Sequence, residues 1–384
     1  MFDPWILPGV AALLLRAGFA LYIAGISRSK NTISGLFRVS IEIAIGILMF
    51  WAFGAAIRDG SWGELFNPRG ANALFIGATY LVGPAIVAGA ALERSRTIVC
   101  IAAALMMPGL LTPVVWKLLH CRWILQTGFV DEAGAVYTHF SAGIAAAVVA
   151  IALGPRLGKY NRDGSTNAVP GHNLPLVAVG VFVLLVMWIP YVAGYAEIQS
   201  RAALNAVLAA AAAMLAACVY CELNFGRQDV LLVYSGLMGG LVSVTAGADR
   251  IAPWAAVVTG VAAGMIVPWI VVRLDLVWKI DDPAGGITVH GVGGILSAIA
   301  VSVLAPGSIG DRANRLGGAL AAMLVVGILT LVVSCAVFLT LRATTGIRVR
   351  EADEIDGLDL SEFDLNAYPD FQQITIKSYH LREM

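Results

Sequence analysis

The stretch DEAGAVYTH, residues 131–139, returns as DDPAGGITVH, residues 281–290, so that His290 follows His139 with a period of 151 residues. In each stretch an Asp stands eight residues before the His, and an Ala-Gly pair stands two and three residues after that Asp. A Gly-Ile pair follows each His at the fourth and fifth positions. The same ionisable pattern therefore occurs twice inside long apolar runs, and this repetition needs a structural reason.

The chain is too apolar for an ordinary soluble protein. Of its 384 residues, 59% are hydrophobic and 13% are charged, and the mean hydropathy is +0.82, whereas soluble domains carry about 25% charged residues. Because lipid admits only helices or closed barrels, and these runs are too long for barrel strands, we expect an all-α polytopic membrane protein. Eleven apolar runs are long enough to cross a bilayer as helices, which takes about 20 residues: 4–27, 37–57, 72–92, 97–119, 133–154, 175–196, 200–221, 229–248, 253–275, 285–306 and 316–342.

Loop charges predict the orientation. Lys and Arg are in modest excess in the loops at residues 27–30, 93–96 and 154–162, and such loops favour the cytoplasmic side. We therefore expect a multi-pass protein of the cytoplasmic membrane with the N-terminus outside and the C-terminus inside. The first apolar run lacks the flanks of a cleaved signal peptide, so we expect it to stay. A net charge of zero gives no basic stripe for nucleic acid.

The repeat divides the membrane domain into two halves of five helices, with the histidines in the fifth and tenth. An odd number of helices in a half makes the second half enter the membrane from the opposite side, as in transporters with inverted repeats. We therefore expect a 5+5 inverted repeat whose two histidine helices are antiparallel and bring both imidazoles to one depth. Heavy glycine usage, including Gly236, Gly240, Gly260 and Gly264, is typical of closely packed membrane helices.

Two histidines at matching positions predict a paired site at the pore centre. A lone membrane histidine often has only a packing role, but a neutral pair can share one hydrogen bond and still offer a donor and an acceptor to a small polar guest such as ammonia or water. Two histidines without a carboxylate or thiolate at ligand spacing make a poor metal set, so we expect no metal, no cofactor and no enzyme. Asp282 is interpreted as a helix N-cap, and Asp131 as an N-cap whose charge also stabilises a cation near the pore.

Six motifs together resemble the Amt group of ammonium transporters, which is related to the Rh proteins. They are GFALYIAGISRSKN at 18–31, ALERS at 91–95, VDEAGAVYTHFSAGIAA at 130–146, GHNLPLVAVGVFVLL at 171–185, DDPAGGITVHGVGG at 281–294 and DEIDGLDLSEFDLNAYPDF at 353–371. The resemblance covers nearly the whole chain. It implies an eleven-helix protomer, a homotrimer and one pore per protomer, with His139 and His290 at its centre. It also implies recruitment of ammonium at an outer aromatic site and passage of the neutral species.

The chain departs from the family at the outer end of the pore. The family's two gate phenylalanines fall on Thr79 and Tyr191, and its recruitment serine falls on Tyr195. Trp116 and Trp123 are the candidates for the recruitment tryptophan, and we include Trp123 in the predicted site. A tyrosine in place of a serine fills volume, so the sequence predicts an entrance that still holds ammonium but is remodelled.

The polar tail predicts a regulatory role. We divide the chain into a membrane domain at 1–343, a cytoplasmic tail at 344–370 and an extension at 371–384, which suits a linker to a signalling module. The tail resembles the family segment that couples protomers and receives PII-type regulators, and some members carry a fused histidine kinase after it. The predicted coupling residues are Asp356, Gly357, Asp359 and Ser361.

Two functions of different classes remain open. An ordinary ammonium transporter is favoured by the twin histidines, Asp131 and the complete helical scaffold. An ammonium receptor, which signals through its tail with little conduction, is favoured by the altered gate positions and the extended tail. We lean toward the receptor.

Overall fold

A computed structural model describes residues 4–62 and 71–369. Within these ranges, ten helical spans are long and apolar enough to cross a membrane, and the helix Val230–Val242 is a shorter apolar one. Together they account for the eleven predicted runs, so the all-helical fold is confirmed. The predicted extension at 371–384 lies outside the described residues.

The spans are built from α-helices interrupted by short π-helical turns. The α-helices of the membrane domain are α1 Ile6–Ile26, α2 Thr32–Met49, α3 Ala55–Asp59, α5 Ala71–Tyr80, α6 Val82–Ala90, α7 Thr97–Met106, α8 Thr112–Leu119, α9 Arg122–Leu125, α10 Ser141–Leu153, α11 Leu174–Tyr195, α12 Gln199–Phe225, α13 Val230–Val242, α14 Pro253–Leu276, α15 Gly293–Leu304 and α16 Ile309–Thr344. The π-helical turns are η2 Phe50–Gly54, η3 Met107–Leu111, η4 Ala135–Phe140 and η5 Gly286–Val292. The tail forms α17 Glu351–Asp356 and α18 Leu358–Phe363, and η1 Ser29–Asn31 is a 3₁₀ turn.

Both histidines lie in π-helical turns at the starts of their spans. His139 lies in η4, which continues as α10, and His290 lies in η5, which continues as α15. The start of each span packs against the continuing helix of the other, since η4 contacts α15 and η5 contacts α10. The two histidine helices are therefore antiparallel, as the inverted repeat predicts. Such π-turns occur mostly as single turns and frequently at functional sites.

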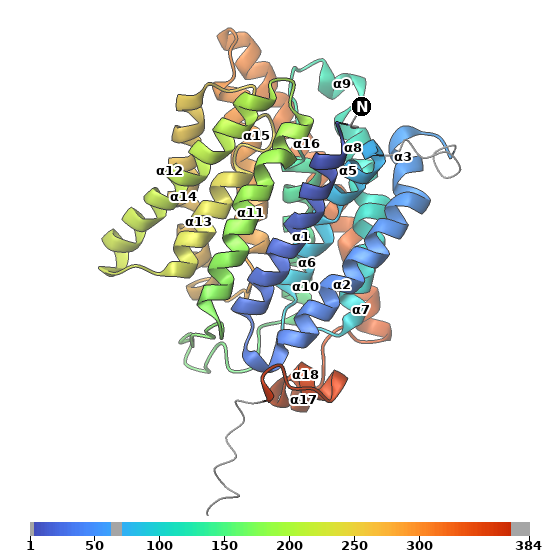
Figure 1. Ribbon diagram of the computed structural model, residues 1–384, viewed down its shortest axis with the longest axis vertical. Coiled ribbons are helices and arrows are strands. Elements are labelled where there is room, and N and C mark those ends of the chain that lie inside the picture. Colours follow the sequence, from blue (N-terminus) through green and yellow to red (C-terminus); the bar gives the residue numbers. More distant parts are fainter. Residues whose placement is uncertain (1–3, 63–70, 370–384) are drawn as a thin grey trace, which may run out of the picture.

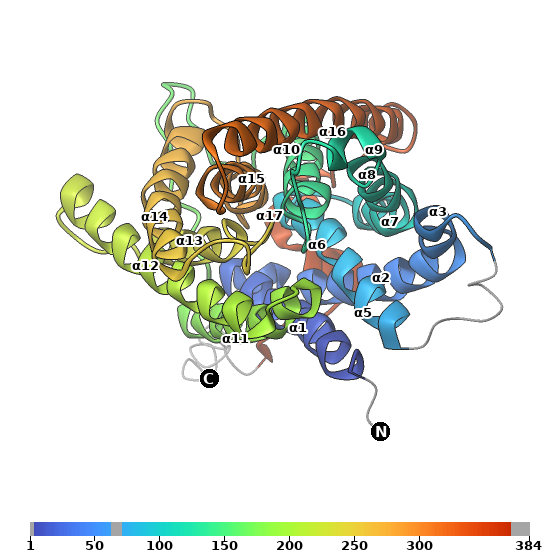
Figure 2. The ribbon, with the colours of Figure 1, turned by 90° about the horizontal axis from the view of Figure 1, so that it is seen from above.

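The bundle has two distinct ends (Figure 1). We call the end that carries α17 and α18 the tail face, and the opposite end, where α1 begins, the far face. Seen from above, α16 crosses one side of the bundle from end to end, while α1 and α11 run along the other side (Figure 2). The 36 residues of α16 begin at a capping box, in which Ser308 and Asp311 satisfy each other's backbone N–H groups.

Glycines let the helices approach closely where the sequence predicts it. A Cβ on Gly264 of α14 would lie 2.1 Å from the carbonyl oxygen of Ala213 of α12, and a Cβ on Gly260 would lie 2.3 Å from that of Ala209. These contacts exclude any side chain larger than hydrogen, so the small residues determine the α12–α14 packing.

The eighth predicted run is shorter as a helix than the sequence suggests. The helix α13 ends at Val242, and the chain then turns through residues 243–250. There the carbonyl of Ala246 accepts a hydrogen bond from the Glu132 N–H at 2.8 Å, and the Ala246 N–H donates to Ser297 at 2.8 Å. Backbone groups that leave the helix therefore bond to the two histidine spans instead.

Candidate functional site

Asp131 and Asp282 cap the two histidine helices in the same way. The Asp131 carboxylate accepts hydrogen bonds from three successive backbone N–H groups at the start of η4, at 2.7–2.9 Å. The Asp282 carboxylate does the same at the start of η5, at 2.8–3.4 Å. Burial raises the pKa of each carboxyl to about 6, and the backbone hydrogen bonds act in the opposite direction. The two aspartates hold the helix starts that carry the histidines.

The Ala-Gly pair of each motif supplies the turn into the helix. Gly134 has φ +89° and Gly285 has φ +73°, both in the left-handed region that glycine adopts at little cost. These turns bring the backbone N–H groups back over the preceding Asp. The spacing of Asp and Gly is therefore one structural unit, used twice.

The glycine four residues after each His permits the two spans to cross. A Cβ on Gly143 would lie 2.4 Å from the Cα of Gly291, and a Cβ on Gly294 would lie 2.5 Å from the carbonyl oxygen of Ala135. Each motif glycine thus packs against the backbone of the other motif. The crossing point lies next to the histidines and determines their separation.

The structure brings His139 and His290 together as the sequence predicts. Their Nδ1 atoms are 3.1 Å apart, and their rings stack with centroids 5.1 Å apart at 11°. His139 is fully buried and His290 is 8% exposed. One ring donates and the other accepts in this contact, so each keeps its Nε2 for another partner. Within the described residues, Nε2 of His139 is buried without a hydrogen-bond partner.

Trp188 is a second ring next to His139, and no sequence motif singles it out. The rings of Trp188 and His139 stack with centroids 5.3 Å apart at 19°. Trp188 is 5% exposed and lies on α11, one helical turn before Tyr191. The sequence did contain a signal for Trp188. It stands three residues before Tyr191 in a predicted helix, and residues three apart lie on the same helix face.

Thr79, Tyr191 and Tyr195 gather between His139 and the far face. Tyr191 packs edge-on between Trp188 and Tyr195, with centroids 5.4 and 6.1 Å away. The hydroxyl of Tyr191 donates to the Ala133 carbonyl of the first motif, and the hydroxyls of Tyr195 and Thr79 are 2.7 Å apart. We call Trp188, Tyr191 and Tyr195 the aromatic stack. Its two tyrosines lie between Trp188 and the far face, because α11 runs toward that face.

The two tryptophan candidates lie elsewhere. Trp116 stacks on His120 at 4.0 Å, and the guanidinium of Arg58 lies 4.3 Å from its ring. Trp123, on α9, is 48% exposed. In the described part of the chain, the ring neighbours of Tyr195 are Tyr191 and Phe75, and a recruitment role for Trp123 stays a prediction.

A small cavity lies on the tail side of the histidines. Its volume is about 30 Å³, enough for a molecule the size of water or ammonia. Ala284 precedes His290 on the way from the tail face, and Leu184 precedes Trp188, so the cavity extends from His290 toward that face. We call it the tail-side cavity. It is lined by Leu15, Arg16, Phe19, Val82, Ala85, Ile86, Leu184, Trp188, Met238, Leu241, Ala284 and His290.

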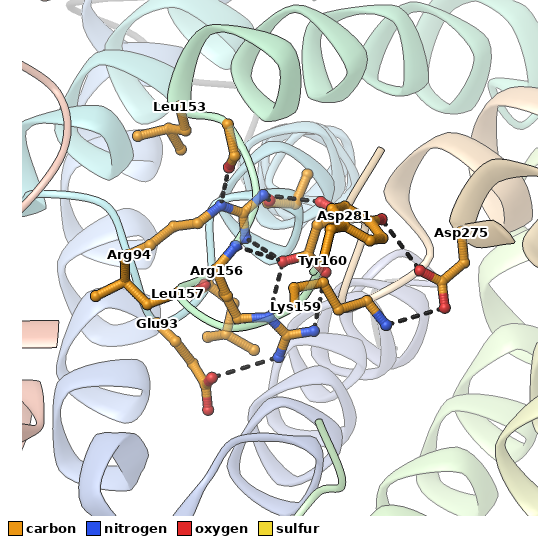
Figure 3. A network of polar contacts seen from close by, with 12 residues as sticks. Glu93, Arg94, Leu153, Arg156, Leu157, Lys159, Tyr160, Asp275 and Asp281 are labelled. Atoms are coloured by element: carbon orange, nitrogen blue, oxygen red, sulfur yellow. Dashed lines mark hydrogen bonds and ion pairs between the residues drawn. The ribbon is translucent and has the colours of Figure 1, made fainter. Parts of the chain in front are cut away.

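The second motif has an additional carboxylate, Asp281, which lies in a buried ion-pair network (Figure 3). Arg156 donates to both Asp281 oxygens, from Nε and Nη2, at 2.9 Å, and to Glu93 at 3.3 Å. Arg94 donates to the Asp281 carbonyl at 2.8 Å. Burial acts to raise the pKa of Asp281, but the Arg156 and Arg94 charges outweigh it and hold the pKa at about 2. We call these four residues the arginine network.

The arginine network continues into the tail through Glu354 of α17. One Glu354 oxygen accepts from the backbone N–H of Leu157, directly after Arg156, at 2.7 Å, and the other accepts from Arg348 at 2.8 Å. Glu354 is 1% exposed. The loop before His290 is thereby connected to the tail by direct contacts.

Two of the four predicted coupling residues contact the region where α2 begins. Asp359 accepts from the backbone N–H groups of Ile33 and Ser34, at 3.0 and 2.8 Å. Gly357, with φ +105°, lies against Lys30. The Ser361 N–H donates to the Gly357 carbonyl at 3.0 Å. Asp356 ends α17. His172 also contacts the tail, through the Tyr368 hydroxyl at 2.7 Å.

Comparisons with known proteins agree with this architecture. A family model described as Ammonium Transporter Family matches residues 5–368. Ammonium transporter Amt2 of Archaeoglobus fulgidus is 31% identical over 411 residues, covering 94% of this chain and 87% of that protein. Ammonium transporter Amt1 of Haloferax mediterranei is 30% identical, covering 93% of this chain and 77% of that protein.

Solved structures share the fold. One described as Sensor Amt Protein is 27% identical with a TM-score of 0.88, and the match covers 94% of this chain and 97% of that one. The crystal structure of Saccharomyces cerevisiae Mep2 is 22% identical with a TM-score of 0.78, covers 91% and 87%, and supports the fold alone.

Proposed function

This chain belongs to the ammonium transporter family, and we propose that it binds ammonium at the His139 and His290 pore and signals through its C-terminal tail, with little conduction. The observation that carries the proposal is the stacking of Trp188 on His139 at 5.3 Å. Trp188 lies against His139 on α11, and Tyr191 and Tyr195 follow it on the same helix toward the far face, so these rings together close the path from His139 in that direction.

Hydrogen bonds hold the rest of the aromatic stack in place. Tyr191, 1% exposed, bonds to Ala133 of the first motif, and Tyr195 bonds to Thr79 of α5. These contacts join α11 to two other elements across the far side of the pore. Movement of the stack breaks buried hydrogen bonds, each with a net value of about 0.5–1.5 kcal/mol, so the closed arrangement is favoured over an open pore.

Signalling requires a connection between the pore and the tail. Asp281 stands directly before the Asp282 cap of the His290 helix, and Arg156 joins it to the loop that Glu354 of the tail holds. A shift of the His290 helix start changes these buried contacts. Asp359 bonds to the backbone at the tail-face end of α2, and Asp356, Gly357 and Ser361 are the other coupling residues of the proposal.

The remaining features of the proposal come from the family resemblance. They are a homotrimer in the cytoplasmic membrane, the N-terminus outside and the tail in the cytoplasm, and a PII-type regulator or signalling kinase as the tail's partner. Asp131 contributes negative charge near the pore in addition to its capping role. Residues 344–370 form the signalling tail.

The test compares binding with conduction in one preparation. Ammonium pulses on proteoliposomes are expected to give small or absent currents, while titration calorimetry detects ammonium binding that His139→Ala and His290→Ala remove. The double variant Trp188→Leu, Tyr191→Ser, which opens the aromatic stack, serves as the positive control for current. A saturating current from the unmodified protein, abolished by either histidine replacement, refutes the sensing proposal.

The tail provides the second readout. Ammonium is expected to change hydrogen exchange in α17 and α18, and Arg156→Gln is expected to abolish that change while ammonium binding stays within about threefold. Lys159→Gln is the matched control, because Lys159 pairs with Asp275 at 2.9 Å on the same face outside the arginine network. An unchanged tail in the unmodified protein contradicts the signalling role.

An ordinary ammonium transporter is the alternative function. It is favoured by the relatives described as ammonium transporters and by the intact pair of histidines. The current measurement above distinguishes the two.

A further inference from the structure

Glu132 breaks the symmetry of the two histidine motifs. It follows the capping Asp131, whereas Pro283 stands at the matching position after Asp282. A residue that the repeat does not keep is not required for helix capping or for the crossing of the two spans. The side chain of Glu132 is 14% exposed, so a carboxyl group is largely buried at the far face for another reason.

A second buried carboxyl group lies against Glu132. Asp249, in the loop between α13 and α14, is 2% exposed, and a hydrogen bond joins its side chain to that of Glu132. One guanidinium serves both groups, because Nε of Arg250 lies 2.6 Å from Oε1 of Glu132 and 3.9 Å from Oδ1 of Asp249. Two carboxyl groups therefore converge on one cation in a largely buried place.

A hydrogen bond between two carboxyl groups requires a proton. Two carboxylates have only acceptors, so one of them is protonated when they bond to each other. Oδ2 of Asp249 accepts from the backbone N–H of Ile198 at 2.9 Å. The buried Oδ1 receives no hydrogen bond from the ordinary donors of the described residues, and a protonated Glu132 supplies the missing donor.

The other charged groups around the pair do not replace that proton. Arg201 donates to the backbone carbonyl of Asp249 at 3.3 Å, and not to its carboxyl group. Glu197, with a 73% exposed side chain, accepts from Nη2 of Arg250 at 2.8 Å and adds another negative charge. Asp131 already accepts from three backbone N–H groups. The pair therefore has one arginine side chain to balance it, which this third carboxylate shares.

The proton is retained at neutral pH. Burial raises the pKa of Glu132 to about 8, the hydrogen bond to Asp249 acts in the same direction, and Arg250 opposes both. Tyr137, the remaining titratable neighbour, donates to the backbone carbonyl of Glu132 at 3.1 Å, and not to its carboxyl group. When alkaline pH removes the proton, two facing carboxylates repel each other.

The carboxyl pair connects the first histidine motif to the loop between α13 and α14. Glu132 belongs to the motif and Asp249 to the loop, and the Glu132 N–H also donates to the Ala246 carbonyl of the loop at 2.8 Å. The carbonyl of Ala133, the next residue, accepts from Tyr191 of the aromatic stack. Separation of the two carboxyl groups therefore loosens the backbone to which the aromatic stack is bonded.

We propose that Glu132 and Asp249 form a proton-binding site, and that the single proton they share holds the first histidine motif against the loop between α13 and α14 until alkaline pH removes it. The inference goes beyond the proposed function, because it needs neither ammonium binding nor signalling. It assigns to the far face a pH-sensitive latch, built around a glutamate that the second motif lacks.

Infrared difference spectroscopy tests the proton. In the unmodified protein, a carbonyl band of a protonated carboxyl group is expected to disappear with a midpoint at about pH 8. Glu132→Gln is expected to remove this band change. Asp249→Asn is expected to lower the midpoint, because the amide donates to an ionised Glu132 and no like charge faces it. Glu197→Gln, which removes another carboxyl group bonded to Arg250, is the matched control and is expected to keep the band.

Two infrared results overturn the proposal. One is a band at this midpoint that persists in Glu132→Gln, or that is absent from the unmodified protein. The other is a midpoint that Asp249→Asn leaves unchanged, because the proton is then not shared with Asp249.

Hydrogen exchange in a peptide covering residues 130–136 tests the latch. Its protection factor, corrected for the pH dependence of intrinsic exchange, is expected to fall about fivefold between about pH 7 and 9 in the unmodified protein. Glu132→Gln is expected to stay protected, because its neutral amide still donates to Asp249. Protection that does not change with pH, or an equal loss in Glu132→Gln, overturns the latch. Neither measurement uses ammonium, so failure of the proposed function remains distinguishable.

Discussion

The two histidine segments are built alike but have different surroundings. Asp131 and Asp282 accept equivalent backbone hydrogen bonds, and both helices begin after a left-handed glycine. Beside the first segment lie the tyrosines of the aromatic stack and Glu132, which pairs with Arg250 at 2.6 Å. Beside the second lies Asp281, enclosed by arginines and 4% exposed.

The residues shared by the two segments and the residues found in only one of them have different roles. The residues that recur make a symmetric centre, because capping and crossing need the same groups on both sides. The residues that do not recur make the two ends different: aromatic rings pack together on the far side, and the arginine network connects the tail side to α17. A duplicated motif therefore predicts the centre of such a protein but not its two ends.

The largest expected effect is the loss of Asp281. Asp281→Asn is expected to lower the free energy of unfolding by about 3–5 kcal/mol, because it leaves the buried Arg156 charge without its main partner. Glu132→Gln, the matched change beside the first motif, is expected to lower it by at most about 1 kcal/mol, because Arg250 is 36% exposed. Unfolding titrations in denaturing detergent measure both, and equal losses contradict the contrast drawn here.

The next effect is an acid dependence specific to the second segment. The pKa of Asp281 lies at about 2, below its ordinary 3.8, so its contribution to stability is present above about pH 4 and is lost as the pH falls toward 2. The loss is expected to be about 2 kcal/mol. The pKa of Asp131 is raised instead, to about 6, so its contribution has the opposite sign and stability falls as the pH rises from about 4 to 6.

Thermal unfolding between pH 7 and 2 tests these signs. Asp281→Asn is expected to remove the loss of stability below about pH 4. The fall in stability as the pH rises from about 4 to 6 is expected to remain. If the stability of this variant still declines below pH 4, the decline comes from other carboxyl groups.

A smaller effect tests whether the two caps are equivalent. Asp131→Ala and Asp282→Ala are each expected to lower the free energy of unfolding by about 1–2 kcal/mol, the usual value of an N-cap. Ammonium binding, measured by calorimetry, is expected to weaken only in Asp131→Ala, because that carboxylate is proposed to stabilise a cation. Equal weakening in both variants indicates that Asp131 acts through helix capping alone.

The smallest effect concerns the tyrosine hydroxyl of the aromatic stack. Tyr191→Phe removes the hydrogen bond to Ala133 and is expected to lower the free energy of unfolding by about 1 kcal/mol. Proteoliposome currents are expected to stay small, because the ring still fills the space. Tyr160→Phe, which loses a 3.0 Å bond to Asp275 on the tail face, is the matched control for a lost hydroxyl. A large current from Tyr191→Phe would mean that the hydrogen bond to Ala133, and not the volume of the ring, closes the pore.

The sequence by itself determined the fold and the centre of the site. Apolar runs of membrane length, the period of 151 residues and the Asp, Gly and His spacing are local or repetitive signals, and they predicted antiparallel histidine helices and both N-caps. The structure adds that the two spans cross at Gly143 and Gly294. These features follow from backbone geometry, which short sequence patterns specify directly.

Only the tertiary structure decided which side chains meet around that centre. Asp281 bonds to Arg156 across 125 positions, and Lys30 reaches Glu354 across 324. Trp188 contacts His139, and Arg16 and His290 line the same cavity, although each pair lies on separate spans. Such neighbours depend on how whole helices pack, and no local pattern encodes that packing.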